Sequence, residues 1–169
     1  YPGAPHLGSQ GTNPKFQIDF TARRGMEANG KDDIVIRNCF FEGSINHHVR
    51  LTNTKNAQII GTHIRGAGTG VSMNTTNVDT VFRNTAFELI QGDGIKTGRG
   101  GIGAQRILVD NCVFQDSGRD GIDTTGGWKD STVRNTIFRR LFSGMDIKSY
   151  YEKPSHVTSD VSNDNMLVQ

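Results

Sequence analysis

The sequence of 169 residues lacks the features that build several common classes of protein. It has two cysteines, too few for a disulfide scaffold that would replace a hydrophobic core. No apolar run approaches the roughly 18 residues that a membrane span needs, which excludes a transmembrane helix. The first residues, 1–14, lack the basic start and the apolar stretch of a signal peptide. With 19 Lys and Arg against 17 Asp and Glu, the charge balance does not point to nucleic acid.

Leucine is also scarce, with only six residues, whereas other residue types are in excess. There are 21 Gly, 13 Asn and 16 Thr residues, and Ile and Val together number 25. This composition favours strands and tight turns over helices. The length is that of one domain, so its core must come from strands.

A six-residue motif recurs along the chain and explains the composition. It reads as an aliphatic residue or Phe, any residue, Asn, a small residue, any residue, and a large apolar residue. Copies follow one another at intervals of 23, 23, 27, 24 and 28 residues, and one copy has Gly in place of Asn. The Asn column is Asn38, Gly61, Asn84, Asn111, Asn135 and Asn163. A period of this kind is typical of repeat architectures.

A second motif follows the first at a nearly constant distance. An apolar residue comes 7 or 8 positions after the end of the first motif, and in four of five copies it follows glycine. Another residue of the same face comes two positions later, so each copy reads as a short alternating strand after a glycine turn. The five apolar residues are Val49, Val71, Ile95, Ile122 and Met145.

Each repeat therefore holds at least two short strands, which cannot bury their apolar faces alone. The repeats must stack, so that equivalent residues of neighbouring coils lie about 4.8 Å apart. Leucine-rich repeats need several Leu per repeat, which six leucines cannot supply, and the intervals do not fit the six-residue period of left-handed hexapeptide helices. The sequence predicts an all-β solenoid with parallel sheets.

The Asn, Gly and β-branched pattern resembles the right-handed parallel β-helix of the pectate lyase-like superfamily, from residue 34 to the C-terminus. The resemblance implies about five to six coils, with inward Asn side chains at a turn and stacked Phe, Ile and Val inside. We expect an irregular segment over 1–15 and a β-helix over 16–169, with 16–20 as a first rung or a cover strand. The expected repeats lie near 34–56, 57–79, 80–106, 107–130, 131–159 and 160–169, the last truncated. Because the last copy has no polar cap, we expect a segment of a longer helix or a protein neighbour that covers the open C-terminal end.

The extra residues between repeats open at one corner only. They are the glycine-rich stretch 98–103 and the stretch 148–160. In solenoids, insertions on one face commonly mark the binding face. The strand of the second motif leads into both loops, so we expect binding residues on that strand.

Alternation along this strand predicts one outward side chain in each coil. They are Arg50, Ser72, Lys96, Asp123 and Asp146, with Lys148 two positions beyond the last, while Asp93 and Asp120 stand just before glycines. Stacked carboxylates raise one another's pKa unless a cation sits between them. A calcium site and an acid–base pair would both use this arrangement. The alternative is a set of ordinary ion pairs between coils, which only keep the surface soluble.

The resemblance to pectate lyase-like enzymes implies a groove for an acidic polysaccharide and cleavage by β-elimination. It implies that a lysine removes the C5 proton beside carboxylates, and that Ca²⁺ or basic side chains neutralise the uronate. The residues that take these roles are Lys96, Lys148, Asp123 and Asp146 for catalysis, Asp93, Asp120, Asp123 and Asp146 for calcium, and Arg99, Trp128, Tyr150 and Tyr151 for the sugar chain.

Two other functions stay open at the level of sequence. The Asn-Thr-Asp, Asp-Asp and Gly-His-Gly series of polygalacturonases and the Asp-Pro-His-Asp signature of mannuronan epimerases are absent, so glycoside hydrolysis ranks behind the lyase. A non-catalytic β-helix, such as a stalk, a tail spike or a subunit of an extracellular assembly, needs none of these residues. All three functions predict a protein that is secreted or displayed on a cell or virion surface.

The repeat register makes further predictions. Cys39 and Cys112 share a column three coils apart, roughly 14 Å, which exceeds the approximately 7 Å limit for a disulfide, so both should be free and poorly exposed. Truncation of a stacked Phe should cost about 3 to 5 kcal/mol, whereas Lys96→Ala should cost about 0 to 1 kcal/mol as an exposed pair. We expect His47 and His48 on the surface.

Overall fold

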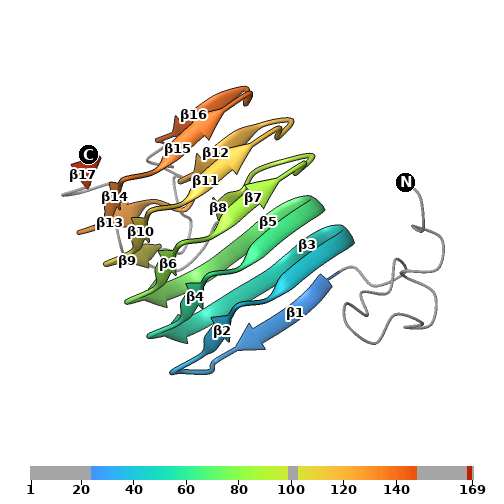
Figure 1. The fold of residues 1–169 in the computed structure, drawn as a ribbon. Helices are drawn as coiled ribbons and strands as arrows, with labels where there is room; N and C mark the ends of the chain where they lie inside the picture. Colours follow the sequence, from blue (N-terminus) through green and yellow to red (C-terminus); the bar gives the residue numbers. More distant parts are fainter. Residues whose placement is uncertain (1–23, 99–102, 148–166, 169) are drawn as a thin grey trace, which may run out of the picture.

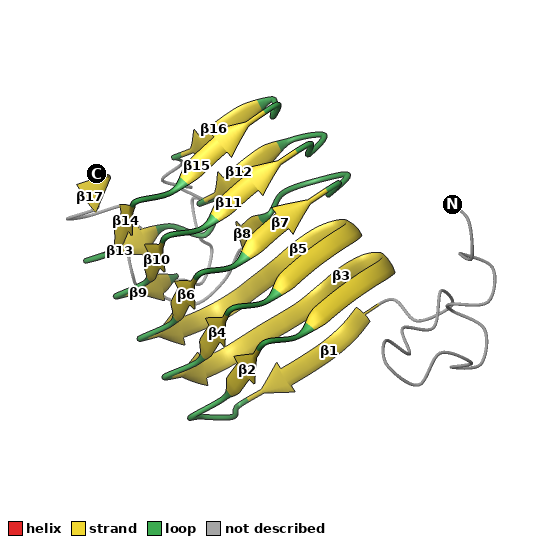
Figure 2. Ribbon diagram, in the orientation of Figure 1, coloured by secondary structure: helices red, strands yellow, loops and turns green. Residues whose placement is uncertain are grey.

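The computed structural model describes residues 24–98, 103–147 and 167–168. Within these ranges every regular element is a strand, and each strand pairs in parallel with its neighbours. Figures 1 and 2 show the strands stacked as successive coils along one axis. The prediction of an all-β parallel solenoid is confirmed, with about five coils.

Seventeen strands make up two sheets, one of eleven strands and one of six. In chain order they are β1 (Arg24–Asn29), β2 (Val35–Arg37), β3 (Phe40–Lys55), β4 (Gln58–Ile60), β5 (His63–Val78), β6 (Val81–Arg83), β7 (Ala86–Glu88), β8 (Ile95–Thr97), β9 (Ala104–Gln105), β10 (Leu108–Asp110), β11 (Val113–Gln115), β12 (Asp120–Asp123), β13 (Trp128–Lys129), β14 (Thr132–Arg134), β15 (Ile137–Arg139), β16 (Ser143–Asp146) and β17 (Leu167–Val168).

Most strands fall on three faces of the solenoid, while β9 and β13 lie beyond face III beside the end of β5. Face I is the six-stranded sheet of β2, β4, β6, β10, β14 and β17. Face II holds the first parts of the long strands β3 and β5, followed by β7, β11 and β15. Face III holds β1, the later parts of β3 and β5, and then β8, β12 and β16. We number the coils 1 (34–56), 2 (57–79), 3 (80–106), 4 (107–130) and 5 (from 131).

Three corners join the faces, and each is a column of residues with positive φ. Corner A is Asp33, Asn56, Asp79, Arg106 and Asp130; corner B is Asn38, Gly61, Asn84, Asn111 and Asn135; corner C is Gly43, Gly66, Leu89, Asp116 and Arg140. The left-handed conformation tolerates Gly and Asn better than other residues, which explains why Gly61 replaces Asn in the repeat. Corner A joins faces III and I, corner B joins I and II, and corner C joins II and III.

The Asn column does not point inward, and that expectation was wrong. Asn38, Asn84, Asn111 and Asn135 are exposed, and their role is to hold the left-handed turn. Part of the amide ladder exists on the outside, since Asn111 Nδ2 donates a hydrogen bond of 2.8 Å to Asn84 Oδ1.

The core is made of stacked columns, as predicted. Phe87, Phe114 and Phe138 stand in register on face II. The ring centroids of Phe87 and Phe114 are 4.5 Å apart, and those of Phe114 and Phe138 are 5.1 Å apart, with nearly parallel planes. Both cysteines are free, as predicted, and Cys112 is buried. Cys39 is exposed, contrary to expectation, because it follows β2, the edge strand of face I; its backbone N–H donates to Thr62 Oγ1 of coil 2 at 3.4 Å.

Strand β1 was missed at the level of sequence. It pairs with β3 so that Met26 lies beside Val49 and Glu27 beside Arg50. Its Gly25-Met26 pair is the second motif of an earlier coil, and this was the available signal. The segments 1–15 and 16–20 lie outside the described residues.

Candidate functional site

A polar column runs along face III, with one residue from each strand. Register places Glu27, Arg50, Ser72, Lys96, Asp123 and Asp146 side by side on six successive strands. The five residues predicted from alternation therefore share one column, and β1 adds Glu27. Inward neighbours such as Val71 and Ile95 are fully buried, so the column stands on a rigid apolar core. The structure thus brings five predicted site residues to one face: Lys96, Asp123, Asp146 and the adjacent Asp93 and Asp120.

Lys96 lies at the centre of this column and binds two carboxylates. Its Nζ is 2.7 Å from Asp93 Oδ2 and 2.9 Å from Asp123 Oδ2. Asp93 and Asp123 are 2 % and 3 % exposed, whereas one third of the Lys96 side chain is exposed. Asp123 was expected to point into solvent, but the ammonium and the neighbouring strands cover it.

Asp120 brings a third carboxylate to the same place. Carboxylate oxygens of Asp93, Asp120 and Asp123 all lie within 4.8 Å of one another, and all three residues are buried. The backbone N–H of Asp120 donates to Asp93 Oδ1 over 3.4 Å. The N–H and hydroxyl of Thr125 both donate to Asp123 Oδ1, at 2.9 and 2.5 Å. With three carboxylates and one ammonium, the group carries a formal charge of −2.

The surroundings of Lys96 decide its protonation state. Burial alone would lower the pKa of its ammonium, but hydrogen bonds and charges from Asp93 and Asp123 outweigh burial, so the pKa lies above its usual 10.5. A general base must be unprotonated near the working pH. Lys96 is therefore a fixed cation in this arrangement, which weakens its expected role as the base of a lyase.

The three aspartates have the spacing of a hard-cation site. Ca²⁺ binds oxygen ligands at about 2.3 to 2.6 Å, so ligand oxygens up to roughly 5 Å apart can share one ion. The group of Asp93, Asp120 and Asp123 meets this condition, but Asp146 is not part of it. The Lys96 ammonium already contacts two of these carboxylates. The residues therefore fit Ca²⁺ only when Lys96 is displaced.

Trp128 is the clear correction among the predicted sugar-binding residues. Its side chain is 0 % exposed and belongs to the hydrophobic core, because strand β13 turns it inward beside Ala104. A ring with no exposed face cannot carry a sugar. Four other predicted residues, Lys148, Arg99, Tyr150 and Tyr151, lie outside the described residues, as do most of the two expected loops.

The expectation that His47 and His48 lie on the surface was also wrong. They are 7 % and 0 % exposed. His48 takes the position that Gly70, Gly94 and Gly121 hold in the later coils, where an added Cβ would meet a core Phe ring, so the His48 ring lies inward against Phe41. His48 Nε2 donates to the backbone oxygen of Arg65 at 2.7 Å.

Comparisons with known proteins address the fold. A family model described as a right handed beta helix region matches residues 10–138. A search of curated proteins found no match. In the described part of the chain, no helix has the length and hydrophobicity needed to cross a membrane.

Proposed function

The chain belongs to the right handed beta helix region family, and from this premise we propose that it binds an extended polysaccharide along face III and cleaves it. We propose that it does so outside the cell or on a cell or virion surface. The observation that carries the proposal is the group of three carboxylates within 4.8 Å of one another, set in a column with one polar residue per coil. The fold alone would not support it, because this architecture hosts many functions.

The polar column suits a regular polymer. Side chains repeat at about 4.8 Å along the solenoid axis, so a sugar chain laid across the strands meets a new set of groups at each coil. Arg50, Ser72 and Asp146 line the approaches to Lys96 and Asp123 on either side. Polar groups from a rigid sheet hold a ligand with little reorganisation.

The carboxylates, rather than Lys96, support the chemistry. Lys96 is held as an ammonium, so it does not act as the base of a β-elimination in this state. Glycoside hydrolysis needs an acid and a second carboxylate, and in retaining enzymes the two carboxyl groups are about 5 to 5.5 Å apart. Carboxylate oxygens of Asp93, Asp120 and Asp123 lie within 4.8 Å of one another, so we propose that two of these groups form such a pair. Hydrolysis therefore ranks ahead of β-elimination, for which a base would have to come from a residue such as Lys148.

The charge of the group bears on the substrate. A formal charge of −2, with Asp146 in the next coil, repels a uronate polymer unless a cation neutralises it. A neutral polysaccharide meets no such repulsion. We therefore propose a neutral polysaccharide as the substrate class, and an acidic one only with Ca²⁺.

A non-catalytic structural β-helix is the second candidate, and one observation favours it. Lys96 already donates to Asp93 and Asp123, so the buried charges neutralise one another in part without any ligand. Ion pairs of the same kind join coils elsewhere, for example Arg106 with Asp79 at corner A and Arg134 with Asp110 on face I. A stalk would use such pairs only for solubility and stability.

The test is a panel of neutral and uronate polysaccharides, with and without Ca²⁺. Hydrolysis releases reducing ends without ultraviolet absorbance, whereas elimination also produces an absorbing unsaturated sugar. The informative variant is Asp123→Asn, and the matched control is Asp110→Asn, an aspartate that pairs with Arg134 on face I. We expect Asp123→Asn to lose cleavage and Asp110→Asn to keep it. Products that absorb in the ultraviolet would show that the reaction is elimination and not hydrolysis. If no polymer is bound or cleaved, the non-catalytic structural function remains.

A further inference from the structure

Corner B lies beside a column of arginine side chains at the ends of the face I strands. Strands β2, β4, β6, β10 and β14 follow one another along the solenoid (Figure 1), and their last residues pair in register. We call these residues the arginine column: Arg37, Ile60, Arg83, Asp110 and Arg134. Three arginines and one aspartate give the column a formal charge of +2. Each arginine is followed in the chain by the asparagine of corner B.

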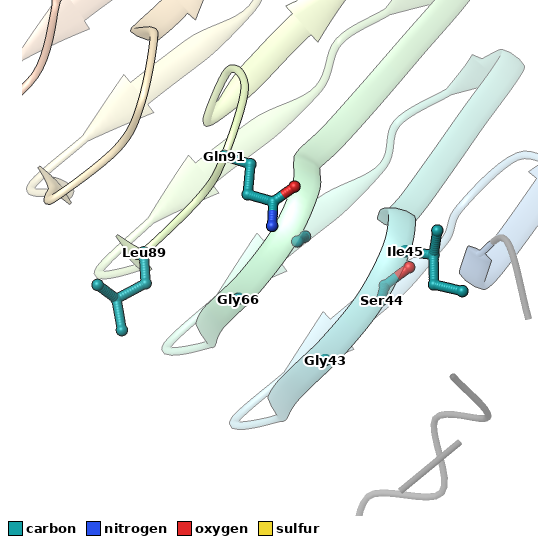
Figure 3. Close-up of a pocket in the computed structure, with 7 residues that line it drawn as sticks. Gly43, Ser44, Ile45, Gly66, Leu89 and Gln91 are labelled. Atoms are coloured by element: carbon teal, nitrogen blue, oxygen red, sulfur yellow. The ribbon is translucent and has the colours of Figure 1, made fainter. Parts of the chain in front are cut away.

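Neighbouring surfaces do not share this positive charge. The outward column of face II is formally neutral, with Glu42, Arg65, Glu88, Gln115 and Arg139. Corner A, with three aspartates and one arginine, carries −2. A hollow of about 430 Å³ at corner C, whose lining includes Ser44, Gly66 and Gln91, has no charged side chain in its lining (Figure 3). The charge distribution therefore attracts an anionic ligand to the arginine column.

Asp110 shows how the side chains of this column hold an oxyanion. Its Oδ2 lies 3.0 Å from Arg134 Nη2 and 3.4 Å from Arg83 Nε, and its Oδ1 accepts a hydrogen bond of 3.1 Å from Asn135 Nδ2. The hydrogen bonds from Arg134 and then Asn135 lower the pKa of the Asp110 carboxyl from 3.8 to about 2. An arginine and the asparagine that follows it therefore stabilise an anion together.

Two further arginine–asparagine pairs flank coil 2. They are Arg37 with Asn38 in coil 1 and Arg83 with Asn84 in coil 3, and all four residues are exposed. Between them the column has Ile60, so coil 2 supplies no carboxylate. Within the described residues, the Arg37 guanidinium has no ion pair, and the amide N–H groups of Asn38 and Asn84 have no acceptor. These donors are open to a ligand.

Gly61, the corner residue of coil 2, leaves room between the two pairs. Its φ is +59°, and an added Cβ would lie 2.5 Å from Asn38 Oδ1. The asparagine of coil 1 therefore lies close to a corner position that has no side chain of its own. From coil 1 to coil 3 the distance along the axis is roughly 10 Å. Arginine side chains from both coils can thus contact one ligand that lies over coil 2.

We propose that corner B across coils 1 to 3 binds a linear sulfated polysaccharide, whose sulfate groups contact the arginine–asparagine pairs of coils 1 and 3. The site lies away from the polar column of face III, so the proposal does not rest on the proposed function. It adds a second binding surface, which needs no catalytic group.

The donors of each pair suit a sulfate group. A guanidinium presents its N–H groups as a planar fork, which two oxygens of an anion satisfy. A sulfate ester has three terminal oxygens, so one remains for the amide of the adjacent asparagine. The Asp110 carboxylate has two oxygens, which it divides between Arg134 and Asn135, so the arginine makes a single hydrogen bond to it.

The spacing of the arginines favours a sparsely charged polymer. Arg37 and Arg83 are two coils apart, roughly 10 Å, whereas phosphates along one strand of DNA are about 3.4 Å apart. An extended chain of six-membered sugar rings advances by about one coil per sugar, so a sulfate on every second sugar meets an arginine each time. Anionic membranes attract clusters of about 4 to 8 basic residues, more than this column holds. The outward column beside it is uncharged and offers no competing carboxylate: Val35, Gln58, Val81, Leu108 and Thr132.

Isothermal titration calorimetry at low ionic strength tests the ligand class. The probe is κ-carrageenan oligosaccharides in the sodium form, which carry one sulfate in each disaccharide and no carboxylate. The comparison ligands are the same oligosaccharides after chemical desulfation, hyaluronan oligosaccharides with one carboxylate in each disaccharide, and single-stranded DNA. We expect the sulfated probe to bind at least about tenfold more tightly than each of the three. Failure of the probe to bind, or equal or tighter binding of any comparison ligand, would overturn the proposal.

Replacing two arginines tests the site. Arg37→Gln with Arg83→Gln should weaken binding of the sulfated probe at least about tenfold. The matched control is Arg106→Gln with Arg139→Gln, which removes the same charge from corner A and face II. This control should bind the probe as the parent does. An equal loss in both double variants would show attraction by net charge alone and would refute a site at corner B.

Ile60→Asp tests the same site without removing an arginine. It places a carboxylate between Arg37 and Arg83, in the column position that Asp110 takes beside Arg83 in coil 4. The new carboxylate should occupy the open donors and weaken binding of the probe at least about tenfold. The control is Gln58→Asp, which adds the same charge at the other end of strand β4 and should retain most of the binding. Ile60→Asp protein that keeps the circular dichroism of the parent and binds the probe as tightly would contradict the proposal.

Discussion

Acid should destabilise this protein through one buried side chain, His48. The ring is fully buried and packs against Phe41 at a centroid distance of 5.9 Å. Its Nδ1 has no hydrogen-bond partner among the described residues. Burial lowers the pKa of His48 from 6.5 to about 4, against the opposing effect of the backbone hydrogen bonds of Arg65 and Gly66, and the nearby charge of His47 lowers it slightly further.

The pKa difference fixes the direction and the size of the effect. Because the folded pKa is below the unfolded pKa, the unfolded chain takes up the proton first as the pH falls. The contribution of neutral His48 to the free energy of unfolding is therefore fully present above pH 6.5. It falls progressively as the pH drops to the folded pKa of about 4, and below that pH His48 causes no further loss. A difference of this size corresponds to about 3 kcal/mol, of which about 2.5 kcal/mol is lost by pH 4.5.

Urea unfolding between pH 7.5 and 4.5 measures this loss. With a slope of about 2 kcal/mol/M for a chain of this size, the midpoint of the parent should fall by about 1 M across the range. His48→Gln removes the titration and should flatten the dependence, even though its starting stability is lower. The control is His63→Gln, since His63 is 38 % exposed and pairs with Glu88 at 3.1 Å. A dependence that survives in His48→Gln, or that disappears in His63→Gln, would show that His48 is not the group responsible.

Three further predictions concern the core, the polar column and the thiols. Phe114→Ala should lower the free energy of unfolding by about 3 to 5 kcal/mol in denaturant titrations, because it opens a cavity between two stacked rings. Lys96→Ala should cost about 2 to 3 kcal/mol, not the small cost expected from sequence, because it leaves two buried carboxylates without their cation. A thiol reagent should titrate Cys39 in the native protein and reach Cys112 only after unfolding, because burial raises the pKa of Cys112 to about 11. Equal thermal losses for Phe114→Ala and the exposed Ile137→Ser, or two native thiols reacting at one rate, would contradict the assignment of inside and outside.

The column structure of the fold was predictable from sequence because a parallel solenoid repeats its environment at every coil. The interval between motifs set the stacking of Phe87 on Phe114, and alternation within a strand set the outward position of Lys96 beside Asp123. Both inferences use only the period of two in a strand and the identity of equivalent coils. They needed no knowledge of the turns.

The predicted inward or outward position of a side chain was wrong where the alternation along a strand is interrupted. His48 and Val49 are consecutive and both fully buried, so alternation fails at His48, whose position glycine takes in the later coils. Trp128 follows the turn over residues 124–127, and alternation cannot be carried across a turn. The burial of Asp123 was missed for a different reason, because the partners that cover it, Lys96 and Thr125, act through side-chain hydrogen bonds. Such bonds depend on rotamers, which the repeat pattern does not encode.

A double replacement in the polar column separates the enzymatic function from the structural one. Lys96→Met with Asp123→Asn removes one positive and one negative charge, so the group with Asp93 and Asp120 keeps its formal charge of −2. Replacing a buried ion pair by groups of similar volume is often neutral for stability, so the double variant should be more stable than Lys96→Met alone by about 1 to 3 kcal/mol. If the pair serves only stability, the double variant recovers only the part of the loss that is due to Asp123, because Asp93 still lacks its cation, and it binds and cleaves no polymer that the parent does not. If Asp123 takes part in catalysis, cleavage is lost in the double variant although its stability recovers, and added Ca²⁺ does not restore it. A double variant no more stable than Lys96→Met would mean that Lys96 and Asp123 are not coupled as the 2.9 Å contact implies.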